Sequence, residues 1–248
     1  MNISTDISLK QYTTMQVGGN ARFLTKATAV EEVPRIYHDA KSRQLPVFVL
    51  GGGSNVIAKD EGFEGIVLLN RIKGFEVMSE DEGSVTLKIG AGEVWDEVVA
   101  RTVDMGLSGI EAMSAIPGTA GAAPVQNVGA YGQEIADTLV EVEAYDSATD
   151  AVVILPAEQC HFSYRHSIFR GSQMGRYCIT AITIRLSLRA PQPPFYAGLQ
   201  RYLDEHHITD YTPAVIRQAV IAIRRDKLPD PTVTPNSGSF FKNAMVQY

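Results

Sequence analysis

The sequence predicts an α+β protein in which one large domain is followed by the opening of a second. Segments with the two-residue alternation of half-buried strands lie between segments with the spacing of amphipathic helices. The proline-rich stretch 190–194 fits neither pattern and is typical of a linker. We therefore place one domain at residues 1–190 and a second at 191–248, which is short for an independent hydrophobic core.

The composition is that of an ordinary globular protein and excludes several classes of partner. Of 248 residues, 45% are hydrophobic and 20% are charged. The net charge of −6 leaves no basic stripe for nucleic acid, and no apolar run approaches the ~18 residues of a membrane span. Residues 1–6 carry no leader pattern. We expect a cytoplasmic monomer with neither a nucleic acid nor a membrane partner.

The two cysteines predict reduced thiols and no metal site. Cys160 and Cys178 form no CxxC pair and have no histidine at ligand spacing.

Helix and strand signals alternate through the first domain. Thr28 with Glu31 three residues later has the pattern of a capping box and predicts a helix over 30–43. Residues 45–50 form a short apolar run that predicts a strand. Further strands are predicted at 85–89, 139–145 and 179–188, and a further helix at 93–105.

The second piece contains one strong helix signal. Thr212 suits an N-cap and Pro213 the first helical position, which predicts a helix to about residue 225. We expect this helix together with one strand pair.

A glycine-rich string follows the strand predicted at 45–50. Gly51, Gly52 and Gly53 allow several backbone N–H groups to converge on an anion, and Ser54 and Asn55 add side-chain donors. The string therefore fits a phosphate, although it is neither a dinucleotide fingerprint nor a Walker loop. A plain glycine-rich turn is the alternative.

A second string, residues 115–132, carries four glycines and two prolines with almost no charge. A solvent-exposed loop would be more polar, so the small residues indicate backbone pressed against an extended ligand. The alternative is a tight loop buried between subdomains.

Two further strings carry cations. Arg165 stands among aromatic residues in 162–169, which suits a bidentate clamp on a carboxylate or, alternatively, an arginine stacked on a tyrosine. Arg224 and Lys227 lie near the end of the predicted helix 213–225, where they suit a diphosphate pocket or simply the helix dipole.

The last string, residues 236–243, joins a Gly-Ser pair to two aromatic residues, a lysine and an asparagine. The hydroxyl of Ser239 can donate and accept a hydrogen bond, and aromatic neighbours can keep it dry. A hairpin edge with an ordinary serine is the alternative.

Together the strings PVFVLGGGSN, IPGTAGAAPVQNVGAYG, FSYRHSIF, KLPDP and GSFFKN resemble, in order, the type I UDP-N-acetylenolpyruvoylglucosamine reductases of bacterial peptidoglycan synthesis, from about residue 10 to 246. The resemblance implies a vanillyl-alcohol-oxidase (PCMH)-type FAD-binding domain of two α/β subdomains, followed by a partial α/β substrate-binding domain. It also implies a flavin-dependent UDP-N-acetylmuramate dehydrogenase. NADPH would reduce FAD, and the flavin would pass a hydride to the enolpyruvyl group of the UDP-sugar substrate.

The resemblance assigns roles residue by residue. Ser239 would protonate the substrate, and Arg165 would stabilise the enolate that precedes protonation. The residues implied to bind FAD are Gly51, Gly52, Gly53, Ser54, Asn55, Ile116, Pro117, Gly118, Gly121, Gln126, Asn127, Gly129, Ala130, Tyr131 and Gly132. Those implied to bind substrate are Tyr164, Tyr196, Arg224, Lys227, Lys242 and Asn243.

Some features depart from the family pattern. Thr13-Thr14 stands where members commonly have Asn-Thr, and Ala122-Ala123 where some have serines. Members also continue beyond the GSFFKN string, so we expect this chain to be C-terminally truncated and impaired in turnover. A non-catalytic flavin-binding fragment and another FAD oxidoreductase of the same fold are the alternatives.

Overall fold

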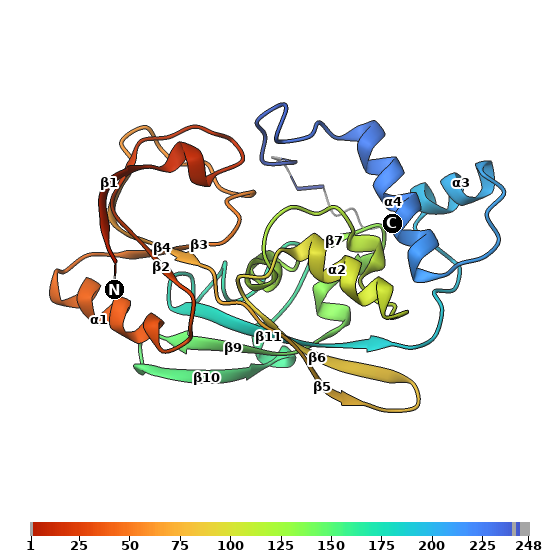
Figure 1. Ribbon diagram of the computed structural model, residues 1–248, viewed down its shortest axis with the longest axis horizontal. Coiled ribbons are helices and arrows are strands. Elements are labelled where there is room, and N and C mark those ends of the chain that lie inside the picture. Colours follow the sequence, from red (N-terminus) through yellow and green to blue (C-terminus); the bar gives the residue numbers. More distant parts are fainter. Residues whose placement is uncertain (1, 240–241, 244–248) are drawn as a thin grey trace.

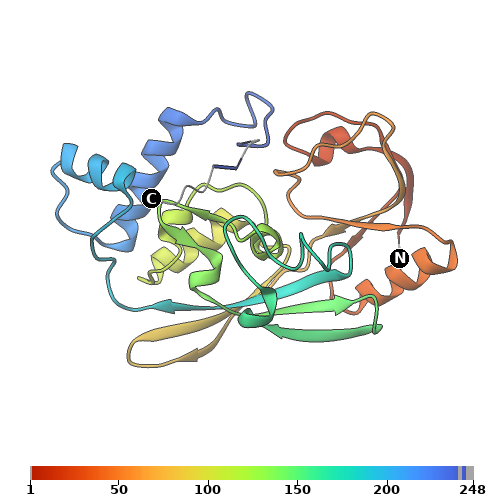
Figure 2. The ribbon, with the colours of Figure 1, turned by 180° about the vertical axis from the view of Figure 1, so that it is seen from behind.

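The computed structural model describes residues 2–239 and 242–243, and they form three adjoining parts (Figure 1). A small sheet with one helix lies at the left of that view, a larger sheet lies below the centre, and a helical part lies at the upper right. Figure 2 shows the same arrangement from behind. The predicted α+β class is confirmed.

The small N-terminal sheet has the strand order β1-β2-β4-β3. Its strands are β1 (Ser4–Ser8), β2 (Asn20–Ala27), β3 (Val47–Leu50) and β4 (Phe63–Asn70). β4 pairs in parallel with both β2 and β3, whereas β1 is antiparallel to β2. Consequently the carboxyl ends of β3 and β4 meet at one edge, where the first glycine string begins.

Helix α1 (Glu32–Ser42) covers this sheet with Val33, Ile36 and Ala40. The predicted helix is confirmed, but the predicted capping partner is wrong. Glu32, not Glu31, accepts the Thr28 N–H at 2.6 Å and the Thr28 hydroxyl at 3.1 Å. The backbone first makes a turn after Thr28, so the carboxylate that reaches back comes from one residue later.

The larger sheet is antiparallel throughout, in the order β10-β9-β11-β6-β5. Helix α2 (Trp95–Asp104) and the short 3-10 helices η2 (Glu111–Met113) and η3 (Ala120–Gln126) share its core. The strands are β5 (Phe75–Glu80), β6 (Ser84–Gly90), β9 (Leu139–Asp146), β10 (Ala151–Pro156) and β11 (Tyr177–Ser187). The short elements are β7 (Gly129–Ala130), β8 (Gln133–Glu134), η1 (Leu9–Tyr12), η4 (Ile135–Asp137) and η5 (Ala157–Cys160).

The C-terminal part consists of helices α3 (Ala197–Glu205) and α4 (Pro213–Lys227). Thr212 caps α4 as predicted, because its side chain accepts the Val215 N–H at 3.3 Å. The expected strand pair is wrong for residues 191–239, where the structure has two helices and no strand. α3 escapes prediction because its nine residues contain only one fully buried apolar pair, Leu199 and Leu203.

The helical part packs on the first domain as well as on itself. Leu199 and Leu203 of α3 and Val220 of α4 share one cluster with Ala112 of η2. Among the helices that the structure describes, none is both long and apolar enough to cross a membrane.

Asn70 joins the two sheets. Asn70 is 5% exposed; its side-chain N–H donates to the Ile179 carbonyl of β11 at 2.7 Å, and its side-chain oxygen accepts the Ile72 N–H at 3.3 Å. Removing it would leave buried backbone groups without partners.

We predict that Asn70→Ala lowers the free energy of unfolding by about 2 kcal/mol, because it orphans a buried carbonyl and N–H. Urea unfolding measures the loss. Asn20→Ala is the matched control, because among the described residues the exposed side chain of Asn20 on β2 bonds to the Asp6 carboxylate alone, and we expect a loss below about 0.5 kcal/mol. Equal losses for the two variants would show that the Asn70 contacts do not hold the sheets together.

Candidate functional site

The two predicted glycine strings touch each other although they come from different sheets. A Cβ atom on Gly52 would lie 2.9 Å from the Cα of Gly118. The Ser54 hydroxyl donates to the Pro117 carbonyl at 3.1 Å. The strings therefore form one surface of backbone and small polar groups, and a side chain at Gly52 would force it apart.

Gly51 and Gly53 of the first loop also lie too close to neighbouring residues to carry a side chain. A Cβ on Gly51 would lie 2.5 Å from the Thr119 hydroxyl. Gly53 has a φ of +66° and lies so close to the Tyr12 carbonyl that any side chain would collide with it. Asn55, by contrast, is exposed at the end of the loop.

Arg71 places a positive charge behind this loop. It follows β4, and its Nη1 donates to the carbonyls of Gly51 and Asn70, each at 2.9 Å. Desolvation lowers the pKa of Arg71 from its ordinary value. Sequence reasoning missed this residue, although a cation directly after a strand parallel to β3 is a usable signal for an anion site.

The second loop is held along residues 91–95. Ala120 N–H donates to the Glu93 carbonyl at 2.9 Å, and Trp95 N–H donates to the Gly118 carbonyl at 3.1 Å. Gly121 packs on Ala91, where a Cβ would lie 2.5 Å from the alanine methyl. Ile116 is half-buried against the main core and Pro117 is exposed. Residues 91–95 thus fix the backbone of this loop.

Asn127 organises the end of the same string. It has a left-handed backbone with φ 48°. Its side-chain amide donates to Glu134 at 2.6 Å and to the Ser163 carbonyl at 3.2 Å, and its oxygen accepts the Ala136 N–H at 3.2 Å. Both polar atoms of this buried side chain are bonded within the protein, so the role of Asn127 is to fix the backbone of the loop.

Arg165 lies at the tip of a turn closed by Ser163 and His166. Its Nη1 donates to the Asn127 carbonyl at 3.1 Å and its Nη2 to the Gly129 carbonyl at 2.6 Å. Its guanidinium carbon also lies 5.4 Å from the ring centre of Tyr164. The structure therefore brings the predicted cation to the predicted cofactor string and stacks it on a tyrosine as well.

Other predicted residues gather beside β7. The rings of Tyr131 and Tyr196 meet edge to face at 6.0 Å, and the exposed backbone of Gly132 lies against Tyr196. Burial raises the pKa of Tyr131, while the charge of Arg224 acts the other way. Burial lowers the pKa of Arg224, and Tyr131 and Asp96 oppose that shift. Tyr131, Tyr196 and Arg224 thus form one cluster.

Two predicted cofactor residues lie at the edge of this surface. Ala130 is half-buried in β7, next to Tyr131. Gln126 is turned toward Arg170, which donates to its side-chain oxygen at 3.0 Å.

Asp96 joins the second glycine string to α4. It accepts the Ala115 N–H at 2.6 Å and binds Arg217 through two hydrogen bonds of 2.6 and 3.0 Å. Burial would raise the pKa of Asp96, but the hydrogen bonds from Arg217 and Ala115 outweigh it, so that this pKa is lowered. Sequence reasoning missed this pair because its members are 121 positions apart and belong to no motif.

After α4 the chain arches back toward the small sheet, as Figures 1 and 2 show for residues 228–239. Lys227, Ser239, Lys242 and Asn243 are exposed. The Thr14 hydroxyl donates to the Asn236 carbonyl at 2.6 Å, which places this arch beside the first glycine string. Phe240 and Phe241 of the last string lie outside the described residues.

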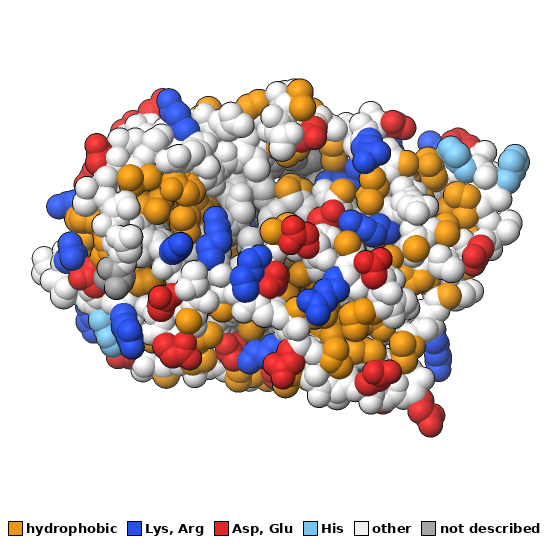
Figure 3. All heavy atoms as spheres, viewed as in Figure 1, with side chains coloured by type: hydrophobic (Ala, Val, Ile, Leu, Met, Phe, Trp, Pro, Cys, Tyr) orange, Lys and Arg blue, Asp and Glu red, His pale blue; other side chains and the backbone are white. Residues whose placement is uncertain are grey.

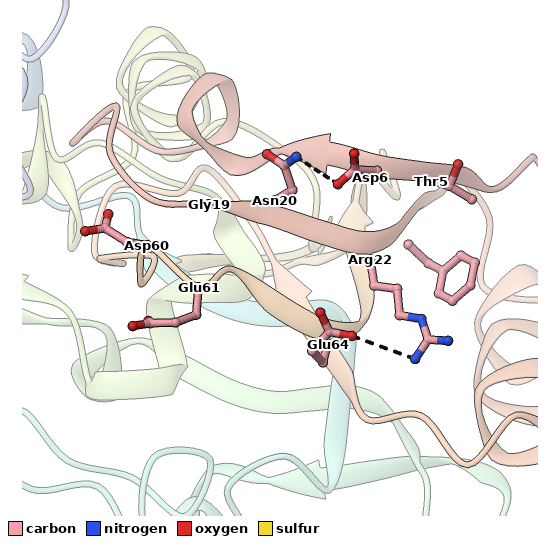
Figure 4. A pocket seen from close by; sticks show the side chains of 9 residues that line it. Thr5, Asp6, Gly19, Asn20, Arg22, Asp60, Glu61 and Glu64 are labelled. Carbon is pink, nitrogen blue, oxygen red and sulfur yellow. Dashed lines mark hydrogen bonds and ion pairs between the residues drawn. The ribbon is translucent and has the colours of Figure 1, made fainter.

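The surface in Figure 3 is hollowed between the small sheet and this arch, and the atoms inside the hollow are mostly backbone and uncharged polar groups. A different hollow, shown in Figure 4, lies on β1, β2 and β4. Asp6, Asp60, Glu61 and Glu64 line it together with Arg22. Its negative charge opposes a phosphate, and none of the predicted site residues lines it.

Comparison with known proteins identifies this arrangement. Residues 21–155 match the FAD binding domain family. The UDP-N-acetylenolpyruvoylglucosamine reductase of Burkholderia cenocepacia is 39% identical over 248 residues, which cover 99% of this chain and 71% of that protein. The enzyme so named from Ralstonia nicotianae is 42% identical over 241 residues, covering 96% and 70%. The chain belongs to the UDP-N-acetylenolpyruvoylglucosamine reductase family.

A solved structure agrees with this assignment. The crystal structure of UDP-N-acetylenolpyruvylglucosamine reductase from Thermus caldophilus superposes with a TM-score of 0.72 at 25% identity, covering 98% of this chain and 76% of that one. The resemblance found in the sequence strings is thereby confirmed, as are the flavoenzyme class and the FAD-binding fold. FAD with NADPH as reductant is the cofactor chemistry of this family.

The glycine surface fits FAD on its own geometry. Side chains at Gly51, Gly52 or Gly53 would fill or distort the cradle between the two loops, so the backbone there is left free to approach a ligand. Arg71 behind the cradle supplies the charge that a pyrophosphate requires.

We predict that Gly52→Ala weakens FAD binding at least about tenfold, because its Cβ would separate the two loops. Absorbance titration of the purified chain with FAD measures the affinity. Gly83→Ala is the control, because a Cβ there would meet nothing closer than the Asp81 carboxylate at 3.9 Å. Unchanged affinity in Gly52→Ala would exclude the loop contact from the cofactor site.

We predict that Asp96→Asn loosens α4 by about 1 kcal/mol, since the pair with Arg217 loses its charge while remaining partly exposed. Amide exchange of α4 should rise about fivefold, since 1 kcal/mol changes a population by that factor. Asp204→Asn on α3 should leave exchange in α4 unchanged, because the exposed Asp204 carboxylate bonds, among the described residues, to Gln200 of the same helix alone. Unchanged exchange in Asp96→Asn would mean that apolar packing alone fixes the helix.

Proposed function

We propose that this chain reduces UDP-N-acetylenolpyruvoylglucosamine to UDP-N-acetylmuramate, with the residues of the two glycine strings as its FAD site. The observation that supports this most directly is the contact of the Gly51–Asn55 loop with the Pro117–Thr119 loop under the arch that carries Ser239. We assign residues 1–190 to the FAD-binding domain and 191–248 to the start of the substrate-binding domain. We further propose a cytoplasmic monomer.

FAD would be held by the two glycine loops and, with NADPH as reductant, would supply the hydride for the methylene carbon of the enolpyruvyl group. The remaining steps fall to the protein. As the double bond accepts the hydride, its electron pair moves toward the substrate carboxylate and forms an enolate. A fixed cation beside that carboxylate lowers the barrier, and we assign this role to Arg165.

The surroundings of Arg165 fit that role. Two of its five N–H groups hold the Asn127 and Gly129 carbonyls, and the guanidinium is braced on Tyr164. Its position is thus set before substrate binds, so little reorganisation is needed in the transition state. The N–H groups that do not hold these carbonyls provide the contact to the substrate carboxylate.

Ser239 completes the reaction. The enolate takes the hydroxyl proton of Ser239 at its α-carbon, and the serine oxygen regains a proton from water. A serine can serve only beside a strongly basic carbanion and away from bulk water. Because Ser239 is exposed in the described structure, the bound substrate itself provides the cover.

The nucleotide diphosphate has a separate set of partners. Arg224 lies in the cluster with Tyr131 and Tyr196, and Lys227 lies one turn further along α4. We assign the diphosphate to these two cations and the nucleotide to the two tyrosines. Lys242 and Asn243 are proposed as further substrate contacts from the end of the arch.

We predict that Ser239→Ala leaves flavin reduction by NADPH unchanged and slows reoxidation of the reduced flavin by UDP-N-acetylenolpyruvoylglucosamine at least about 100-fold. Anaerobic stopped-flow absorbance separates the two half-reactions. Ser237→Ala, two residues earlier in the same arch, is the control and should reoxidise at the rate of the unaltered chain. Equal reoxidation in the unaltered chain and Ser239→Ala would remove the serine from the mechanism.

A further inference from the structure

Thr14 is bonded both to the first glycine string and to the arch that carries Ser239. Its N–H donates to the Gly53 carbonyl at 3.1 Å, and its hydroxyl donates to the Asn236 carbonyl at 2.6 Å. The neighbouring backbone is pressed on the same loop, because a Cβ on Gly53 would lie 2.9 Å from the Cα of Thr13. Thr14 therefore connects the glycine loop to an arch that lies 222 positions after Thr14 in the chain.

Asn236 also connects residues within the arch through its side chain. Its side-chain amide donates to the carbonyls of Pro229 at 3.2 Å and Thr234 at 2.8 Å, and its oxygen accepts the Gly238 N–H at 3.1 Å. Asp230 closes the near end, since its carboxylate accepts the Thr232 N–H and its carbonyl accepts the Thr234 N–H, each at 2.8 Å. Residues 229–238 thus form one folded loop, which ends directly before Ser239.

The hydroxyl of Thr14 holds the arch to the N-terminal part of the chain. Within the described residues, no other hydrogen bond joins the loop 229–239 to any residue before α4. Without it no hydrogen bond among the described residues would hold the loop to the residues before α4. Ser239 would then be free to move relative to the glycine surface.

We propose that Thr14 is a positioning residue for the protonation half of the reaction. Its hydroxyl sets the position of Ser239 relative to the cofactor loop through Asn236. This inference rests on the proposed role of Ser239. The N–H of Thr14 serves the cofactor loop and its hydroxyl serves the arch, so removing the hydroxyl alone should separate the two functions.

The expected effect is selective because proton transfer depends steeply on geometry. A displacement of 1 Å at a catalytic group can cost up to about 100-fold in rate. A single uncharged hydrogen bond contributes little to global stability, so its loss should shift the loop population without unfolding the chain. The role proposed for the arch is in protonation of the substrate, so we expect hydride uptake from NADPH to be unaffected.

The test compares three variants of the full chain. Thr14→Val removes the hydroxyl at nearly constant shape and keeps the N–H, while Thr14→Ser restores the hydroxyl. Thr13→Val is the matched control, because the hydroxyl of this neighbouring, buried threonine has no partner among the described residues. Bound FAD, anaerobic reduction by NADPH, reoxidation by UDP-N-acetylenolpyruvoylglucosamine and amide exchange at 232–238 are measured for each.

We expect reoxidation to slow about fivefold or more in Thr14→Val, with bound FAD and reduction by NADPH unchanged. Exchange at Gly238 should accelerate in the same variant. Thr14→Ser should recover both properties, and Thr13→Val should match the unaltered chain.

Reoxidation or exchange at the unaltered rate in Thr14→Val would overturn the inference, as would a parallel loss of FAD or of reduction by NADPH. If Ser239→Ala slows reoxidation and Thr14→Val does not, only the role of Thr14 fails. If Ser239→Ala reoxidises normally, or the unaltered chain is not reoxidised at all, the proposed function fails and this inference fails with it.

Discussion

The close approach of Gly52 to Gly118 is the constraint on which the rest of the site depends. The small sheet delivers one loop at the carboxyl ends of parallel strands β3 and β4, and the larger sheet delivers the other along residues 91–95. Each loop is well supported within its own sheet, but the cofactor surface exists only where they meet. A Cβ on Gly52 would lie 2.9 Å from the Cα of Gly118, and Gly118 itself has a φ of +124°, which residues with a side chain rarely adopt. Glycine is therefore required there by packing as well as by ligand binding.

The charge distribution explains how a chain with a net charge of −6 can bind two phosphorylated ligands. Arg71 lies behind the first glycine loop, whereas Arg224 lies on α4 beside Tyr131. Both guanidinium groups are partly desolvated, which strengthens their interaction with an anion relative to an exposed lysine. The acidic residues of β1, β2 and the 60–64 segment lie in a separate hollow. Local cations, not the overall charge, determine which anions this surface accepts.

Local signals predicted the local structure well. The Thr212 cap and the apolar alternation of β6, β9 and β11 depend on residues that are close in sequence, and the structure confirms both predictions. The errors share a cause. Glu32 accepts the Thr28 N–H in place of Glu31 because one extra turn residue shifts the start of the helix. Helix α3 is stabilised because Leu199 and Leu203 pack against Val220 and Ala112. Arg71, Asp96, Arg217 and Thr14 act through partners between 19 and 222 positions away, which no local pattern specifies.

The C-terminal part is attached to the first domain by two ties of different physical kinds. Asp96 binds Arg217 through a partly exposed ion pair, which dissolved salt screens. Thr14 binds Asn236 through an uncharged hydrogen bond, which salt hardly affects. The first tie holds the helix that carries Arg224 and Lys227, and the second holds the loop that ends at Ser239. Because the two ties respond to different conditions, the segment assigned to the diphosphate and the segment assigned to proton transfer can loosen independently. The covalent link at the end of α4 then limits how far one can move without the other.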